Sequence, residues 1–94
     1  MKIEYFDNVW EALEDDPAVV ASLTARSELI TAIRQAVKQW KLTQAAAAKR
    51  LGLTQPRLND LLRGRIDKFS LDALMNIATA AGLRVKVEVV KTAA

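Results

Sequence analysis

The segment 43–62, TQAAAAKRLGLTQPRLNDLL, constrains the fold of this chain more than any other stretch. It predicts two short helices joined by a tight turn. Thr43 and Thr54 each stand where a hydroxyl can accept a hydrogen bond from a free N–H in the first turn of a helix. Four consecutive alanines favour helix and let a second helix cross closely. Gly52 stands where the first helix must stop and the chain must turn with positive φ.

Leucines supply the larger apolar contacts between the two predicted helices. Ala47 lies one turn before Leu51 on the same face of the first helix. At about 100° per residue, Leu58, Leu61 and Leu62 cluster on one side of the second helix. The opposite side and its flanks carry Gln55, Pro56, Arg57, Asn59, Asp60 and Arg63.

These outer residues include the side chains that a reader of the DNA major groove needs. Arginine can bind guanine O6 and N7 through two hydrogen bonds, and asparagine or glutamine can do the same for adenine. They stand at the front of the second helix, where such a helix enters the groove. The alternative is a small helical domain with an ordinary solvated face. Because caps, alanines, glycine and leucines all agree, we favour a helix-turn-helix that binds DNA.

The charge of the chain is divided unevenly along its length. Residues 1–20 carry six acidic residues and one lysine, whereas residues 21–94 carry thirteen basic and five acidic residues. Seven of the basic residues fall within 41–68, on and around the predicted motif. Binding to the phosphates of DNA requires such a cluster of basic residues. The alternative, that basic residues only keep an alanine-rich chain in solution, does not explain why they coincide with the motif.

Composition argues against several other classes of protein. Cysteine and histidine are absent, so no disulfide or thiolate metal site can form and the usual general base is missing. With only three glycines there is no glycine-rich phosphate loop. We therefore expect no enzyme activity, no metal and no cofactor. No apolar run approaches the ~20 residues that span a membrane, and the N-terminus lacks an apolar signal core, so we expect a cytoplasmic protein.

Start and stop signals predict further helices on both sides of the motif. A short helix is expected at 7–13, a longer one at 25–40, and another at 70–82, which Ser70 would cap. Asp16 and Pro17 form a second start signal ahead of the longer helix, a cap followed by a proline in the first turn. We therefore expect an all-α, five-helix fold in one compact domain. Its parts would be an acidic helical segment at 1–24, a helix-turn-helix domain at 25–82 and a C-terminal strand at 83–90.

The C-terminal segment changes from helical to strand periodicity. Within 83–90, apolar and charged residues alternate, which is typical of a strand with one buried face. A lone strand needs a partner for its backbone groups. A second copy, paired antiparallel about Val87, would place Lys86 opposite Glu88 twice, so we expect a homodimer. The alternative is an intramolecular hairpin with residues 1–6. The residues expected at the dimer contact are Leu83, Val85, Lys86, Val87, Glu88 and Val89.

Two sets of short runs carry a resemblance to known proteins. Those of the motif are LTQ at 42–44, Gly52, TQPRL at 54–58 and LLRG at 61–64. Together they resemble the phage-repressor or XRE class of helix-turn-helix proteins, which implies a phage-repressor-like domain. The flanking runs are WEALED at 10–15, RSEL at 26–29, FSLD at 69–72 and AAGL at 80–83. With these, roughly residues 7–90 are similar to HigA-type antitoxins of bacterial type II toxin–antitoxin systems.

The resemblance implies a role at DNA for each matched position. Gln44 would donate to a phosphate from the start of its helix. Thr54 and Gln55 would meet a phosphate and the first base. The full set of residues expected to contact DNA is Thr43, Gln44, Lys49, Thr54, Gln55, Pro56, Arg57, Asn59, Asp60, Arg63, Arg65 and Lys68.

Asp60 fits this pattern less well than its neighbours. An acidic side chain faces DNA poorly unless it accepts a hydrogen bond from cytosine N4. The second possibility is that Asp60 orients Arg57 or Arg63, each three residues away on the helix. Two roles for Asp60 therefore stay open, direct base contact and the orientation of a neighbouring arginine.

The resemblance also implies a protein partner. This would be an RNA-cleaving toxin of the HigB or RelE type, which the antitoxin neutralises. As a dimer, the antitoxin would repress the shared promoter at a near-palindromic operator, with half-sites ~34 Å apart. The acidic N-terminal stretch would face a basic toxin. Two alternatives stay open: a solitary XRE-type transcriptional regulator without a toxin partner, and a protein-binding adaptor that uses the helical fold without DNA.

Overall fold

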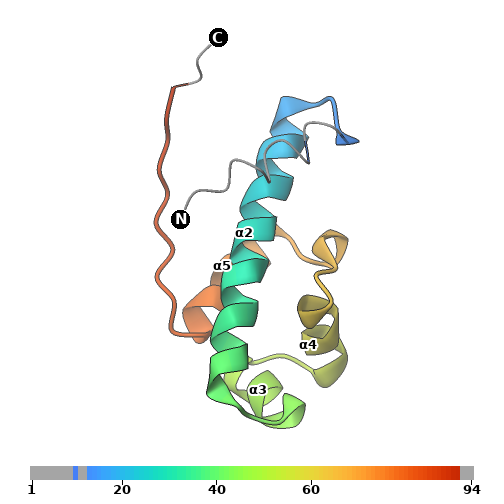
Figure 1. Cartoon of the computed structure of the whole chain (residues 1–94), viewed down its shortest axis with the longest axis vertical. Coiled ribbons are helices and arrows are strands. Elements are labelled where there is room, and N and C mark those ends of the chain that lie inside the picture. Colours follow the sequence, from blue (N-terminus) through green and yellow to red (C-terminus); the bar gives the residue numbers. More distant parts are fainter. Residues whose placement is uncertain (1–9, 11–12, 92–94) are drawn as a thin grey trace.

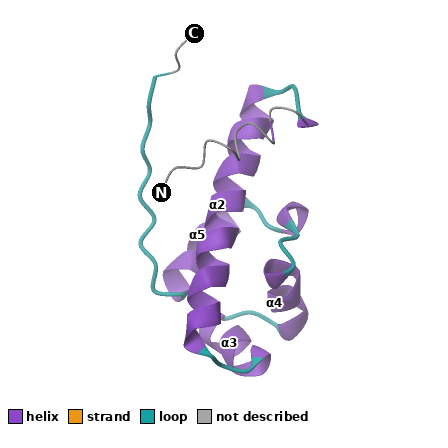
Figure 2. Cartoon of the chain, viewed as in Figure 1, coloured by secondary structure: helices purple, strands orange, loops and turns teal. Residues whose placement is uncertain are grey.

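The structure is a computed structural model that describes residue 10 and residues 13–91. Figure 1 shows the long helix α2 (Pro17–Trp40) through the middle of the molecule, with α4 on one side and the C-terminal segment on the other. The other elements of this part are all helical (Figure 2): α3 (Gln44–Leu51), α4 (Gln55–Leu62), the 3-10 helix η1 (Ile66–Lys68) and α5 (Leu71–Ala80). Within the described residues, no helix is both long and apolar enough to cross a membrane.

Helix α2 begins as the sequence predicts but continues where a break was expected. The Asp16 side chain caps it by accepting from the Ala18 N–H at 2.9 Å, and Pro17 occupies the first turn. The piece that begins at the Asp16 and Pro17 start signal and the helix expected at 25–40 are one helix. The Thr24 hydroxyl donates to the Val20 carbonyl at 2.7 Å, so its polar group is satisfied inside the helix.

The described part of the chain holds four α-helices and one 3-10 helix, so the predicted count of five α-helices is not reached within it. The helix expected at 7–13 lies outside the described residues, except for Trp10 and Leu13.

The core lies where α2, α3, α4 and α5 meet. Its largest fully buried side chains are Ile33 from α2, Leu58 and Leu61 from α4, Phe69 after η1, and Leu74 from α5. Burial of a side chain of this size contributes about 1.5–3 kcal/mol. These contacts therefore fix the direction of α4 against α2, and with it the surface that α4 turns outward.

The predicted C-terminal strand is not formed in the single chain. Residues 83–91 run as an extended segment beside α2 (Figure 1) and pair with no other segment of the described part. Leu83 and Val85 pack against the core, whereas Val87 and Val89 are 77% and 89% exposed. A strand ladder needs a second strand, which this part of the chain does not offer. The alternative hairpin partner, residues 1–6, lies outside the described residues.

Candidate nucleic-acid interface

Helices α3 and α4 form the predicted pair, and local hydrogen bonds close their ends. The Thr43 hydroxyl accepts from the Ala46 N–H and the Thr54 hydroxyl accepts from the Arg57 N–H, both at 3.2 Å. Gly52 ends α3 with a φ of +71°. A residue with a Cβ atom adopts this conformation at a cost of roughly 1–2 kcal/mol, so glycine suits the turn. The two predicted caps and the glycine turn are confirmed.

Helix α4 presents a polar face to solvent. Leu58 and Leu61 are fully buried, whereas Gln55 and Arg63 are exposed, with Asn59 partly exposed between them. Because Gln55, Asn59 and Arg63 follow each other at intervals of four, they form one stripe along the helix. The exposed members of the predicted DNA-binding set are Thr43, Gln44, Lys49, Thr54, Gln55, Pro56, Arg63, Arg65 and Lys68.

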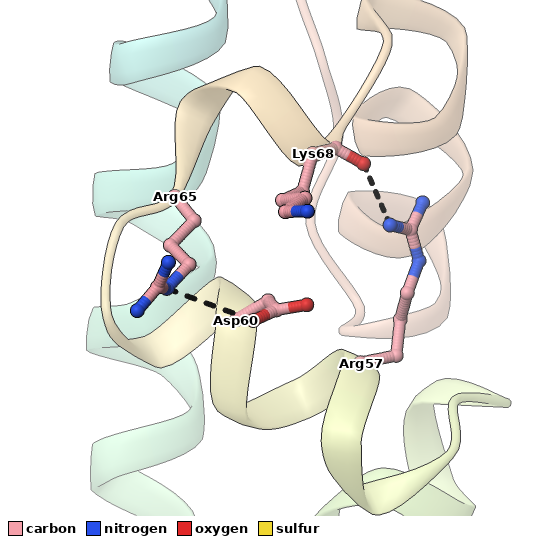
Figure 3. Close-up of polar contacts among 4 residues, drawn as sticks. All are labelled: Arg57, Asp60, Arg65 and Lys68. Atoms are coloured by element: carbon pink, nitrogen blue, oxygen red, sulfur yellow. Dashed lines mark hydrogen bonds and ion pairs between the residues drawn. The ribbon is translucent and has the colours of Figure 1, made fainter.

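Arg57 does not point out with that stripe. One of its guanidinium nitrogens, Nη1, donates to the Lys68 carbonyl at 2.6 Å, as Figure 3 shows. The guanidinium also stacks on the Phe69 ring, 4.0 Å from its centroid. Phe69 itself is buried. Arg57 therefore fastens the side of α4 to the link between η1 and α5.

Asp60 lies on the same flank of α4 and pairs with Arg65. Its carboxylate is 3.7 Å from Arg65 Nε (Figure 3), and its backbone carbonyl accepts from the Arg65 N–H at 3.0 Å. Sequence reasoning named Arg57 or Arg63 as its partner. Arg65 takes this place because Gly64, with a φ of +69°, turns the chain back toward α4. The two side chains are 32% and 49% exposed, so the pair adds little to stability but orients both charges.

Arg26 of α2 holds the same link from the other side. Its Nη1 donates to the carbonyls of Ile66 and Phe69, both at 3.3 Å. Sequence reasoning missed Arg26, because its partners lie 40 or more residues away and no local pattern marks them. Helices α2 and α4 thus both place an arginine on the residues around η1.

A second arginine missed by sequence reasoning lies on α3. The Arg50 guanidinium stacks over the Trp40 ring at the end of α2, 3.9 Å from its centroid. Its neighbour Lys49 is exposed, as expected of a residue that contacts phosphate. An aromatic residue at a helix end and a basic residue one helix later would have been the signal for this pair.

Comparison with known proteins agrees with this geometry. Residues 12–90 match the family described as a helix-turn-helix domain. A solved structure of a protein assigned to the XRE family of transcriptional regulators aligns with a TM-score of 0.69 at 29% identity. The alignment covers 77% of this chain and 81% of the other. No curated protein sequence matches significantly.

The role of Arg57 as a fastener can be tested through stability. Arg57→Ala removes a hydrogen bond from a charged group and the stacking on Phe69. We expect the free energy of unfolding in urea to fall by about 1–3 kcal/mol. The matched control is Gln55→Ala on the exposed face of the same helix, which should change it by less than about 0.5 kcal/mol. Equal stabilities for the two variants would contradict the role.

Proposed function

The chain belongs to the helix-turn-helix domain family, and we propose that it is a sequence-specific DNA-binding transcriptional regulator. The observation that carries the proposal is the polar stripe of α4 formed by Gln55, Asn59 and Arg63. These side chains reach solvent, whereas Leu58 and Leu61 of the same helix are buried. A helix with donors and acceptors along one exposed face can read base edges in the major groove. The structural likeness to a protein assigned to the XRE regulators supports the same function.

We propose that base reading falls mainly to the two amide side chains of the stripe. Gln55 and Asn59 can each make two hydrogen bonds to adenine, at N6 and N7. Arg57 is engaged with Lys68 and Phe69, so we assign it the positioning of α4 and not the reading of guanine. The exposed Lys49, together with the residues after α4, would hold phosphates.

We propose a homodimer as the form that binds DNA. The support is the extended segment 83–91, whose backbone pairs with no other described segment and whose Val87 and Val89 side chains lie mostly in solvent. Antiparallel pairing with a second copy would satisfy that backbone and set Lys86 opposite Glu88. Two copies would then match a near-palindromic operator with half-sites ~34 Å apart.

We further propose that the regulator is the antitoxin of an RNA-cleaving toxin of the HigB or RelE type. The resemblance of the sequence to HigA-type antitoxins supports this, as do the acidic residues Glu14, Asp15 and Asp16. These stand before α2, whose 24 residues span about 36 Å. A toxin held at that end would leave the helix-turn-helix free for DNA.

Fluorescence anisotropy with the upstream region of the gene and a scrambled duplex tests DNA binding. We expect tighter binding to the upstream region, weakening as salt rises. Gln55→Ala and Asn59→Ala should each cost about 1–3 kcal/mol on the operator and relax the preference for one base pair. Lys49→Ala, the control for phosphate contact, should weaken both duplexes alike. Equal, weak binding of the unchanged protein to both duplexes would move the function to protein binding alone.

The dimer is tested by sedimentation at micromolar concentration. We expect two copies for the unchanged chain and a shift toward one copy for Val87→Pro, because proline removes a ladder donor from the middle of the paired segment. The matched control is Val90→Pro, near the end of the segment. A monomeric unchanged protein would rule out the dimer.

The antitoxin assignment is tested by pull-down of the toxin encoded beside the gene. Glu14 accepts from the backbone N–H groups of Asp15 and Asp16, and Asp16 caps α2, so only Asp15 can be reversed without removing a structural hydrogen bond of this turn. Asp15→Lys should weaken toxin capture and leave operator binding unchanged. If Asp15→Lys captures the toxin with the affinity of the unchanged chain, the acidic docking site is contradicted. If neither the unchanged chain nor the variant captures a toxin, a solitary regulator is favoured.

A further inference from the structure

A helix lying in the major groove has a phosphate backbone on each side of it. The groove is ~12 Å wide and a helix with its side chains is about 10–12 Å across, so both flanks of the helix come near phosphates. One flank of α4, with Arg57 and Asp60, meets η1, where Arg65 and Lys68 are exposed basic residues. The opposite flank of α4 would lie near the second phosphate backbone.

That opposite flank borders a hollow of about 610 Å³ between α4 and α2. Leu58 and Leu62, which line it, lie three and seven residues after Gln55 and so continue down the Gln55 side of the helix. On the α2 side the hollow is lined by Arg34, Lys38 and Lys41. Gln44, at the start of α3, also lines it. The hollow therefore adjoins both helices of the motif although its cations come from α2.

Every charged residue that lines this hollow is basic. All three basic residues are exposed: Arg34 and Lys38 lie one turn apart on α2, and Lys41 is the residue that caps its C-terminus. Val37 and Leu42 supply apolar walls. Long basic side chains can lie along such walls while their charged ends remain in water. Cations held at the rim of an apolar hollow are well placed for an anion that stays outside it.

Resting on the proposed DNA binding, we propose that Arg34, Lys38 and Lys41 form a second phosphate-binding flank for the DNA backbone. This flank serves the strand opposite the one that Arg65 and Lys68 approach. Arg34 also reaches the turn after α4, because its Nη1 lies 3.6 Å from where a Cβ atom on Gly64 would stand. The flank thus extends from the start of α3 to the end of α4.

A purely structural role for these cations predicts something different. Basic residues near a helix C-terminus stabilise the helix dipole, and Lys38 stands in the last turn of α2. That role changes stability and leaves the salt dependence of DNA binding unaltered. Phosphate contact changes the salt dependence, because each neutralised phosphate releases counterions. The two roles are therefore separable in one experiment.

The test measures affinity for the operator and the scrambled duplex across a range of salt concentrations. Lys38→Ala should weaken both duplexes by the same factor and reduce the slope of log K against log salt by about one. The double variant Arg34→Ala with Lys38→Ala should reduce it by about two. Lys38→Arg, which keeps the positive charge, should keep the slope of the unchanged chain. Gln39→Ala is the matched control: its side chain is exposed on α2 next to Lys38 and carries no charge, so its slope should equal that of the unchanged chain.

Three outcomes would overturn the assignment. If the unchanged chain binds DNA tightly and salt-dependently, and neither Lys38→Ala nor the double variant alters the slope, the second phosphate-binding flank is refuted. The proposed function then stands. Unchanged slopes together with binding of inorganic phosphate that Lys38→Ala abolishes assign the hollow to a free anion. An unchanged chain that shows no salt-dependent DNA binding removes the proposed function and the flank together.

Discussion

The direction of α4 depends on the buried ring of Phe69. The ring closes the link between η1 and α5, and the Arg57 guanidinium stacks on it at 4.0 Å. Arg26 reaches the Phe69 carbonyl from α2 at 3.3 Å. Because Phe69 is held from α2 as well, α4 cannot rotate about its axis without uncovering the Phe69 ring and breaking the Arg57–Lys68 hydrogen bond. The stripe with Gln55 and Asn59 stays outward for that reason.

Helix starts were the part of this fold that sequence predicted best. Asp16, Thr43, Thr54 and Ser70 were expected to cap helices, and each side chain accepts from a backbone N–H two or three residues later. A cap depends on residues that are adjacent in the chain, so the sequence contains all the information needed. The leucine side of α4 was predictable for the same reason, since its period follows from helix geometry.

The partners of charged side chains could not be predicted in this way. Asp60 was expected to pair within its own helix, but it pairs with Arg65 beyond the turn. Arg57 fits a base-reading position by spacing, yet its contacts run to Lys68 and Phe69. A long flexible side chain can reach several partners of similar interaction energy, and the tertiary packing determines which of them it contacts. Alternation over 83–90 likewise predicts an extended backbone but does not say whether its partner belongs to the same chain or another.

The unbroken course of α2 gives the molecule a mechanical property. Its C-terminal half is clamped in the core through Ile30 and Ile33, whereas its first turns project beyond α4 and α5 (Figure 1). A continuous helix is stiff over this length because its backbone hydrogen bonds form an unbroken ladder. By geometry, a small tilt of α2 at its buried half therefore becomes a larger displacement at the Asp16 end. A molecule that grips this end would sense the orientation of the core without touching it.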